Sequence, residues 1–431
     1  MRSSRDPLTG TRTSTLKRTS TAIFSQPGFR AFLMVRLAAM FAMQIQAIVV
    51  AWHMYDMTRH PLTLAYVGLA QFIPMVLLLL PAGDLLDRFD RRRILQISWG
   101  VSVLSSAALL WLALTETVDT WPYYVALFVF GCTRAFTGPA VQSLLPQIVA
   151  REHLAQAIAT NSMIMKVAVI AGPLLGGLLY AAIGGWTFGV CLLGFAIGVL
   201  LLQWVPSVRI VRPVDDQTTA VSRFTAGIRF ITSRPIILGA ISLDLFAVLL
   251  GGVVALLPIY AAEILHVGPA GLGLLRSAIA LGELGMGFYL SIRPLNARMG
   301  QRMFLAVAVF GVANLVFALS TWFWVSCAAL FVAGAADMIS VYIRSSLIQF
   351  ATPDDMRGRV SAVNMLFIGS SNELGEFRAG VSATALGTVP AALFGAISTL
   401  VIVGLWTRLF RPLWTIENNE QALPERQKQP S

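Results

Sequence analysis

The chain has 431 residues, of which 56% are hydrophobic and 12% charged, and its mean hydropathy is +0.73. A soluble protein of this length needs roughly a quarter of its residues charged to cover its surface, so this composition excludes an ordinary soluble protein and indicates that lipid covers much of the chain. The net charge of +11 belongs to basic loops in such a protein, and we expect no nucleic-acid partner.

Residues 1–28 are expected to form a flexible cytoplasmic tail. Residues 1–22 are rich in Ser, Thr, Arg and Lys, hold one acid, Asp6, and lack the apolar core of a signal peptide. An organellar transit peptide is the alternative for such a start. However, the next apolar stretch is a full span with no small-residue cleavage site, which argues against that alternative.

Twelve apolar runs follow, each near the roughly 20 residues that a helix needs to cross a bilayer. The ninth is short. The runs cover residues 31–55, 62–86, 94–114, 123–144, 154–183, 186–205, 236–262, 270–292, 303–319, 322–350, 360–386 and 391–409.

Basic residues fall almost entirely in alternate connections. The segment before the first span and the connection at 206–235 hold the largest groups, whereas the opposite connections offer only Arg59. Because basic loops are retained in the cytoplasm, this asymmetry predicts an even number of spans and a multi-pass membrane protein with both termini cytoplasmic.

A cytoplasmic linker at 206–235, the longest polar interruption, divides the chain into six-span halves at 29–205 and 236–410, and a cytoplasmic tail covers 411–431. The halves resemble each other weakly, since an offset of 203 carries Asn161 onto Asn364. Two related bundles that meet face to face can enclose a cavity at mid-membrane that opens to either side. This arrangement is typical of a transporter.

The loop at 83–92, GDLLDRFDRR, resembles the G-x-x-x-D-R-x-G-R-R signature of the major facilitator superfamily, with Asp90 at the second glycine. The resemblance implies a cytoplasmic gating loop, although retention of positive charge alone explains the arginines equally well. The residues assigned to this loop are Gly83, Asp87, Arg88, Arg91 and Arg92.

Span five contains AVIAGPLLGG at 168–177, which is similar to the antiporter motif G-x-x-x-G-P-x-x-G-G of exporters in that superfamily. The similarity favours export, and the alternative is tight helix packing without a coupling role. The motif residues are Gly172, Pro173, Gly176 and Gly177.

The segments 352–364 and 370–377, TPDDMRGRVSAVN and SSNELGEF, resemble the enterobactin-exporter-like branch of the superfamily, as does LDLFAVL at 243–249. The resemblance extends from about residue 27 to 410. It implies an all-α integral protein of the bacterial inner membrane with twelve transmembrane helices in two pseudo-symmetric six-helix bundles.

Ionisable groups at bilayer depth are costly and are functional-site hypotheses by default. Glu373 and Glu376 share a helix face, where they either hold a proton or are neutralised by Arg378 or another buried base and only fix the helix register. The candidates for substrate binding or proton coupling are Arg134, Asp244, Glu283, Asp337, Arg344, Glu373 and Glu376.

Two of these candidates have specific expectations. We expect Asp244 to line the cavity, or else to pair with Lys166 or Arg134. Arg134 resembles the R-x-x-x-G element that the superfamily associates with proton coupling, and it binds an anionic substrate, relays a proton or forms a buried salt bridge.

The sequence has no catalytic constellation, P-loop, metal-ligand cluster or CxxC pair, so we expect no enzyme, cofactor or metal. An ion gradient then supplies the energy. The leading hypothesis is a monomeric exporter, coupled to protons, of a catechol siderophore or similar anion. Multidrug efflux, nutrient uptake and a non-transporting sensor or scaffold remain as alternatives.

Overall fold

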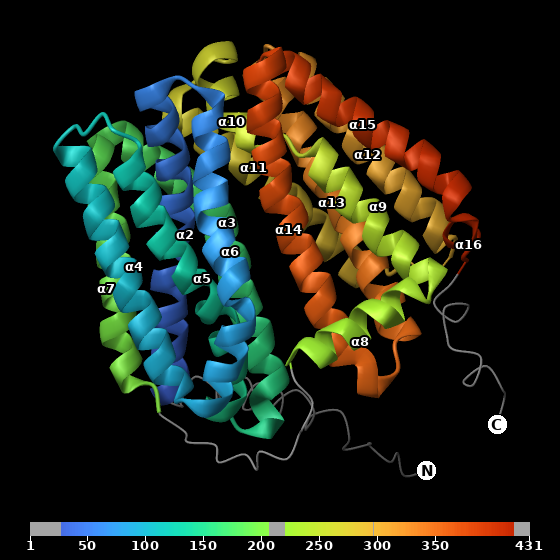
Figure 1. Cartoon of the computed structure of the whole chain (residues 1–431), viewed down its shortest axis with the longest axis horizontal. Helices are drawn as coiled ribbons and strands as arrows, with labels where there is room; N and C mark the ends of the chain where they lie inside the picture. The colour runs from blue at the N-terminus through green and yellow to red at the C-terminus, as the bar shows by residue number, and fades with distance from the viewer. Residues whose placement is uncertain (1–26, 207–219, 296, 418–431) are drawn as a thin grey trace, which may run out of the picture.

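The computed structural model describes residues 27–206, 220–295 and 297–417, and their regular elements are all helical. Two bundles of six long helices stand side by side (Figure 1). The N-terminal bundle contains α2 (Pro27–Thr58), α3 (Pro61–Arg88), α4 (Arg91–Leu114), α5 (Trp121–Ile148), α6 (Leu154–Ile183) and α7 (Thr187–Leu201). The C-terminal bundle contains α9 (Pro235–Gly251), α11 (Gly268–Ile292), α12 (Met299–Leu319), α13 (Phe323–Ala351), α14 (Asp354–Leu386) and α15 (Thr388–Leu409). The predicted twelve-helix fold is confirmed.

The helix α14 is the most polar of the twelve, and α11 carries Arg276 and Glu283 near its middle. Nine helical stretches of the described chain are long and apolar enough to cross a membrane, and one of them, 151–204, holds both α6 and α7. The helices α11 and α14 do not meet this measure because they carry charged residues at mid-length. A polar helix is stable at that depth only when its polar face turns away from lipid.

The seventh span is broken rather than continuous as the sequence predicts. The helix α9 ends at Gly251, and the span continues as a short turn, α10 (Leu257–Ile259) and a π-helical turn at Tyr260–Ile264. The guanidinium group of Arg378 donates to the carbonyl groups of Leu249 and Gly252 at 3.3 and 3.2 Å. Arg378 thereby satisfies backbone groups that the break releases, and it does not pair with Glu373 or Glu376.

Part of the predicted linker folds against the C-terminal bundle. Residues 207–219 lie outside the described chain, and α8 (Ala220–Thr232) packs on α14. A side chain at Gly227 would collide with the carbonyl group of Arg359, so glycine permits this close contact. The helix α16 (Arg411–Trp414) follows α15, and the carbonyl groups of Glu417 and Ile416 accept from the first backbone N–H groups of α12.

Apolar clusters show that the two bundles join at one end and stay separate at the other. The cluster that contains Trp52, Tyr55, Leu257 and Tyr260 takes residues from both bundles. Two further clusters, one built around Phe29 and Leu144 and the other around Met303 and Leu347, stay within one bundle each. We call the joined end, which holds the loops 59–60 and 387, the sealed end, and the opposite end, which carries α8, the basic end. Figure 1 shows the bundles converging near α10 and diverging toward α8.

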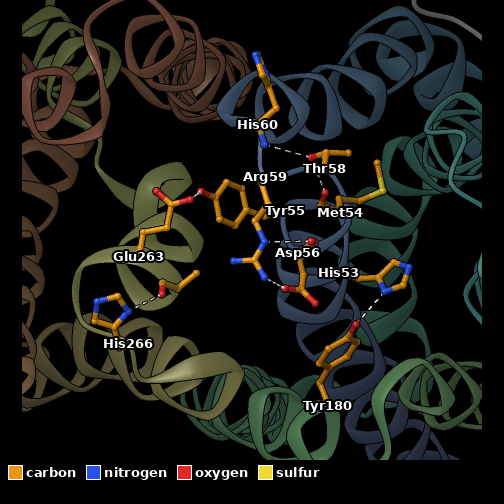
Figure 2. A network of polar contacts seen from close by, with 11 residues as sticks. His53, Met54, Tyr55, Asp56, Thr58, Arg59, His60, Tyr180, Glu263 and His266 are labelled. Carbon is orange, nitrogen blue, oxygen red and sulfur yellow. Dashed lines mark hydrogen bonds and ion pairs between the residues drawn. The ribbon is translucent and has the colours of Figure 1, made fainter.

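A polar network adds to the apolar contact at the sealed end (Figure 2). The hydroxyl group of Tyr55 on α2 donates to the carboxylate of Glu263 on the π-helical turn, so this hydrogen bond crosses between the bundles. His53 bonds the hydroxyl groups of Tyr180 and Tyr123 at 2.8 and 3.1 Å and thereby ties together helices of the N-terminal bundle.

Candidate functional site

A cavity of about 300 Å³ lies between the two bundles. Its walls come from α2, α3 and α5 on one side and from α11, α14 and the broken part of the seventh span on the other. We call it the central cavity. Its polar lining residues are Gln44, Gln46, Gln71, Arg134, Arg276, Glu373 and Glu376.

Arg134 and Glu373 bridge the central cavity. The Nη2 atom of Arg134 lies 3.0 Å from the Oε1 atom of Glu373, and Nη1 reaches the amide oxygen of Gln71 at 3.5 Å. The two charged side chains are 32% and 15% exposed, so the pair borders open space rather than being packed away. A substrate with an acidic group can therefore compete for Arg134 without first opening a fully buried pair.

Glu376 also lines the central cavity and shares this wall with Arg276 of α11. Glu373 therefore meets Arg134 of the opposite bundle, whereas Glu376 lines the cavity together with Arg276 of its own bundle. With two arginines and two glutamates, the cavity has both signs of charge. Phe130 is its one aromatic lining residue within the described chain, which is less aromatic character than a catechol ligand would lead us to expect.

Gln46 is a polar group that the sequence did not single out. It is 1% exposed, its amide oxygen accepts from Ser106 at 2.6 Å, and its amide nitrogen has no partner among the described residues. A buried donor without an acceptor is costly. Gln46 belongs to the wall of the central cavity, so a ligand acceptor is one means of satisfying it.

A second ion pair joins the bundles beside the central cavity. The Nζ atom of Lys166 on α6 lies 3.5 Å from the Oε2 atom of Glu283 on α11. Nearby along α11, the hydroxyl group of Ser277 donates to the carbonyl group of Ile170 at 2.7 Å. In both ion pairs the N-terminal bundle supplies the base and the C-terminal bundle the acid, so separation of the bundles would expose charges of opposite sign.

Asp244 does not lie in the central cavity. Its carboxylate pairs with the guanidinium group of Arg344, and both side chains are buried, at 7% and 3% exposed. This pair corrects the expected pairing with Lys166 or Arg134. Asp337 lies between this pair and the central cavity, in the walls of two smaller cavities inside the C-terminal bundle.

Several polar residues of the loop at 83–92 form hydrogen bonds at or near the ends of helices. Asp90 caps α4, since its carboxylate accepts from the backbone N–H of Arg92 at 2.9 Å. The guanidinium group of Arg92 donates to the carbonyl group of Gln203 just after α7 at 2.8 Å, and Arg91 donates to that of Ser143. Such contacts stabilise the negative ends of helices.

The remaining residues of the motif are Gly83, Asp87 and Arg88. Arg88 pairs with Asp84 one turn earlier at 3.0 Å, on the exposed surface. A side chain at Gly83 would meet nothing within 4 Å. The side chain of Asp87 lies outside the described residues. The gating role of the loop stays a prediction.

The glycines of span five sit at helix contacts. Side chains at Gly172 and Gly176 would come within 2.5 Å of Gln44 and 3.1 Å of Ile45, both on α2 of the same bundle. Gly177 is different, because a side chain there would come 2.3 Å from the carbonyl oxygen of Pro269 on α11. The carbonyl oxygen of Pro173 likewise lies against Gly273 of α11. The motif therefore joins α6 to both α2 and the opposite bundle.

The fold and the charged cavity between two bundles define a membrane transporter of the major facilitator superfamily. The model of the transmembrane secretion effector family matches residues 18–430, so the chain belongs to that family. The chain is thus a multi-pass transporter of the inner membrane rather than an enzyme, as the sequence predicted.

Two relatives are exporters by name. The chain is 28% identical to the enterobactin exporter EntS of Citrobacter koseri, over 79% of this chain and 81% of that protein. It is 26% identical to the enterobactin exporter EntS of Escherichia coli O1:K1, over 90% and 94% of the two chains. The predicted resemblance to the enterobactin-exporter-like branch is confirmed.

Solved structures support the same fold. A point mutant of the nucleoside transporter NupG has a TM-score of 0.72 at 11% identity, covering 89% of this chain and 99% of that one. A bacterial homologue of the iron transporter ferroportin in its inward-facing state has a TM-score of 0.68 at 17% identity, covering 90% and 98%.

Proposed function

We propose that this transporter exports a siderophore of the enterobactin type, or a similar polar small molecule, as a monomer driven by inward flow of protons. The observation that carries the proposal is the Arg134–Glu373 pair, which joins the two bundles across the central cavity. The names of the relatives supply the substrate class.

In this proposal the bundles alternate between two arrangements around the central cavity. The structure is joined at the sealed end and separate at the basic end. If the basic end faces the cytoplasm, as the basic loops predict, substrate enters from the cytoplasm in this arrangement. An acidic substrate displaces Glu373 from Arg134, and the bundles rearrange to release the substrate on the outer side. There Glu373 binds a proton, so the empty transporter returns with one fewer buried charge, and the proton leaves to the cytoplasm when Glu373 pairs with Arg134 again.

The mixed charge of the central cavity favours a second candidate, efflux of varied drugs. Two arginines and two glutamates with a mainly apolar remainder can accept cationic as well as anionic ligands. In drug efflux, the transported molecules need not include a siderophore.

The experiment that tests the proposal uses full-length protein in inside-out proteoliposomes with an acidic interior. Enterobactin and a cationic dye are supplied outside, and uptake is followed with and without a protonophore. Uptake of enterobactin that the protonophore abolishes supports the proposal. Uptake of the dye alone supports drug efflux, and enterobactin uptake that the protonophore leaves unchanged contradicts proton coupling.

A further inference from the structure

Two small cavities inside the C-terminal bundle continue inward from the central cavity. The first, of about 160 Å³, shares Glu376 and Val254 with the wall of the central cavity. The second, of about 10 Å³, shares Asp337 and Phe310 with the wall of the first. We call the two together the inner chamber.

The polar side chains of the inner chamber follow one another in depth. Glu376 stands at the boundary with the central cavity, Asp337 stands between the two small cavities, and Asp244 with its partner Arg344 stands at the far side. Asn314 and Asn372 add amide groups to the larger cavity. Glu283 also lines the larger cavity, and apolar residues make up most of the remaining wall.

Asp337 differs from three other acids of the bundle. Asp244, Glu283 and Glu373 each have a basic partner. Within the described chain, no hydrogen bond or ion pair engages the carboxylate of Asp337. A charged carboxylate without a partner inside a membrane is costly, and a bound proton removes that cost.

A second group points to the same small cavity. Ser340, one turn from Asp337 on α13, lines the cavity of about 10 Å³, is 2% exposed, and its hydroxyl group has no hydrogen-bond partner among the described residues. Such a cavity is about the smallest that holds one water molecule. A water molecule there would satisfy Ser340 and connect the carboxylates of Asp337 and Asp244.

We propose that the inner chamber is a proton-binding site centred on Asp337, separate from the substrate site and reached from the central cavity past Glu376. The proton adds to the carboxylate of Asp337 to give a neutral carboxylic acid, and it leaves as hydronium by the same route or through the water beside Ser340. This inference rests on the proposed function for its role in transport, although proton binding itself requires no substrate.

The charged groups that face Asp337 give the site its link to bundle movement. Glu283 of α11 lines the larger cavity with Asp337 and pairs with Lys166 of α6. Glu376 of α14 and Asp244 of α9 share its cavities, and α12 contributes the uncharged residues Phe310 and Asn314. The Lys166–Glu283 pair crosses between the bundles. When the bundles separate there, Lys166 leaves and a negative Glu283 favours the protonated form of Asp337.

The test is infrared titration of the full-length protein in proteoliposomes, without substrate, in potassium buffers. The neutral carboxylic acid of Asp337 should give a C=O band that disappears as the pH rises. The band should be missing in Asp337→Asn and retained in Asp119→Asn, which alters an exposed loop residue in the same way. Ser340→Ala should shift the pH at which the band disappears.

The same variants separate this inference from the proposed function. Asp337→Asn should retain exchange of substrate across the membrane but lose accumulation against a gradient. A band that persists in Asp337→Asn overturns the inference, whatever the substrate is. A band that responds to Na⁺ at constant pH overturns the assignment to a proton. If the titration behaves as expected and enterobactin is not transported, the proton site is supported and enterobactin is excluded as the substrate.

Discussion

Arg134 and Glu373 belong to different bundles, so their ion pair contributes both to a binding surface and to the contact between the bundles. Hydrogen bonds between charged groups contribute more than neutral ones, about 1.5–3 kcal/mol each. Because both side chains border the central cavity, a substrate can replace either partner. In the proposed cycle, the pair is therefore a contact that is made and broken in each turnover.

Substitution of Arg134 by Gln should reduce transport roughly tenfold or more, because a loss of about 1.5 kcal/mol in binding corresponds to that factor. The measurement is initial transport rate against substrate concentration in proteoliposomes. Arg134→Lys keeps the charge and should retain part of the rate. Equal rates in Arg134→Gln and the unchanged protein would remove Arg134 from the substrate site.

Asp244 and Arg344 form a pair of another kind, because both are almost fully buried. Asp244→Asn leaves Arg344 charged without a partner and should lower the free energy of unfolding by about 3 kcal/mol. Reversible unfolding in mixed micelles measures this change. The double variant Asp244→Asn with Arg344→Gln should recover much of the loss, and no recovery would mean that the two residues contribute independently.

At the scale of the element, hydropathy and loop charge were sufficient to predict the helices but not their partners. The ends of most helices could be predicted within a few residues, and α12 begins at Met299 rather than at 303. The break after α9 could not be predicted, since its carbonyl groups are satisfied by Arg378 from α14, 126 positions away. The pairing of Asp244 with Arg344 could not be predicted for the same reason. Sequence spacing within one helix gives no information about which distant helix supplies a counter-charge.

The contact between α6 and α11 provides a prediction at this scale. Gly177→Ala would place a methyl group 2.3 Å from the carbonyl oxygen of Pro269, so it should force the bundles apart at the sealed end and reduce transport and thermal stability. Gly404→Ala is the matched control, because a side chain there meets nothing within 4 Å. If both variants melt at the same temperature, the close contact is not required.

At the scale of the whole molecule, the sealed end holds the bundles in one arrangement through an apolar cluster and the hydrogen bond from Tyr55 to Glu263 (Figure 2). Opening of the sealed end must therefore separate the apolar cluster and break the hydrogen bond from Tyr55 to Glu263. The basic end lacks a shared apolar cluster within the described residues, so the free-energy difference between the arrangements depends on what forms there when the sealed end opens.

Tyr55→Phe should increase the population open at the sealed end about tenfold, since a hydrogen bond to a carboxylate contributes at least about 1.5 kcal/mol. The three native cysteines are first replaced, and spin labels are attached at Glu116→Cys and Trp322→Cys. The distribution of distances between the two labels then measures the population that is open at the sealed end. Asp56→Asn is the control, because its pair with Arg59 stays within one bundle. An unchanged distance distribution in Tyr55→Phe would show that the apolar cluster alone holds this end.

The shared cluster at the sealed end also bears on how the protein is assembled in the cell. Because side chains of both bundles form one apolar core there, and α8 packs on α14 of the C-terminal bundle, mutual recognition of the bundles is encoded in their interface rather than in the covalent connection. Two separately translated fragments, cut before α8, should therefore find each other in the bilayer and copurify as a complementing pair.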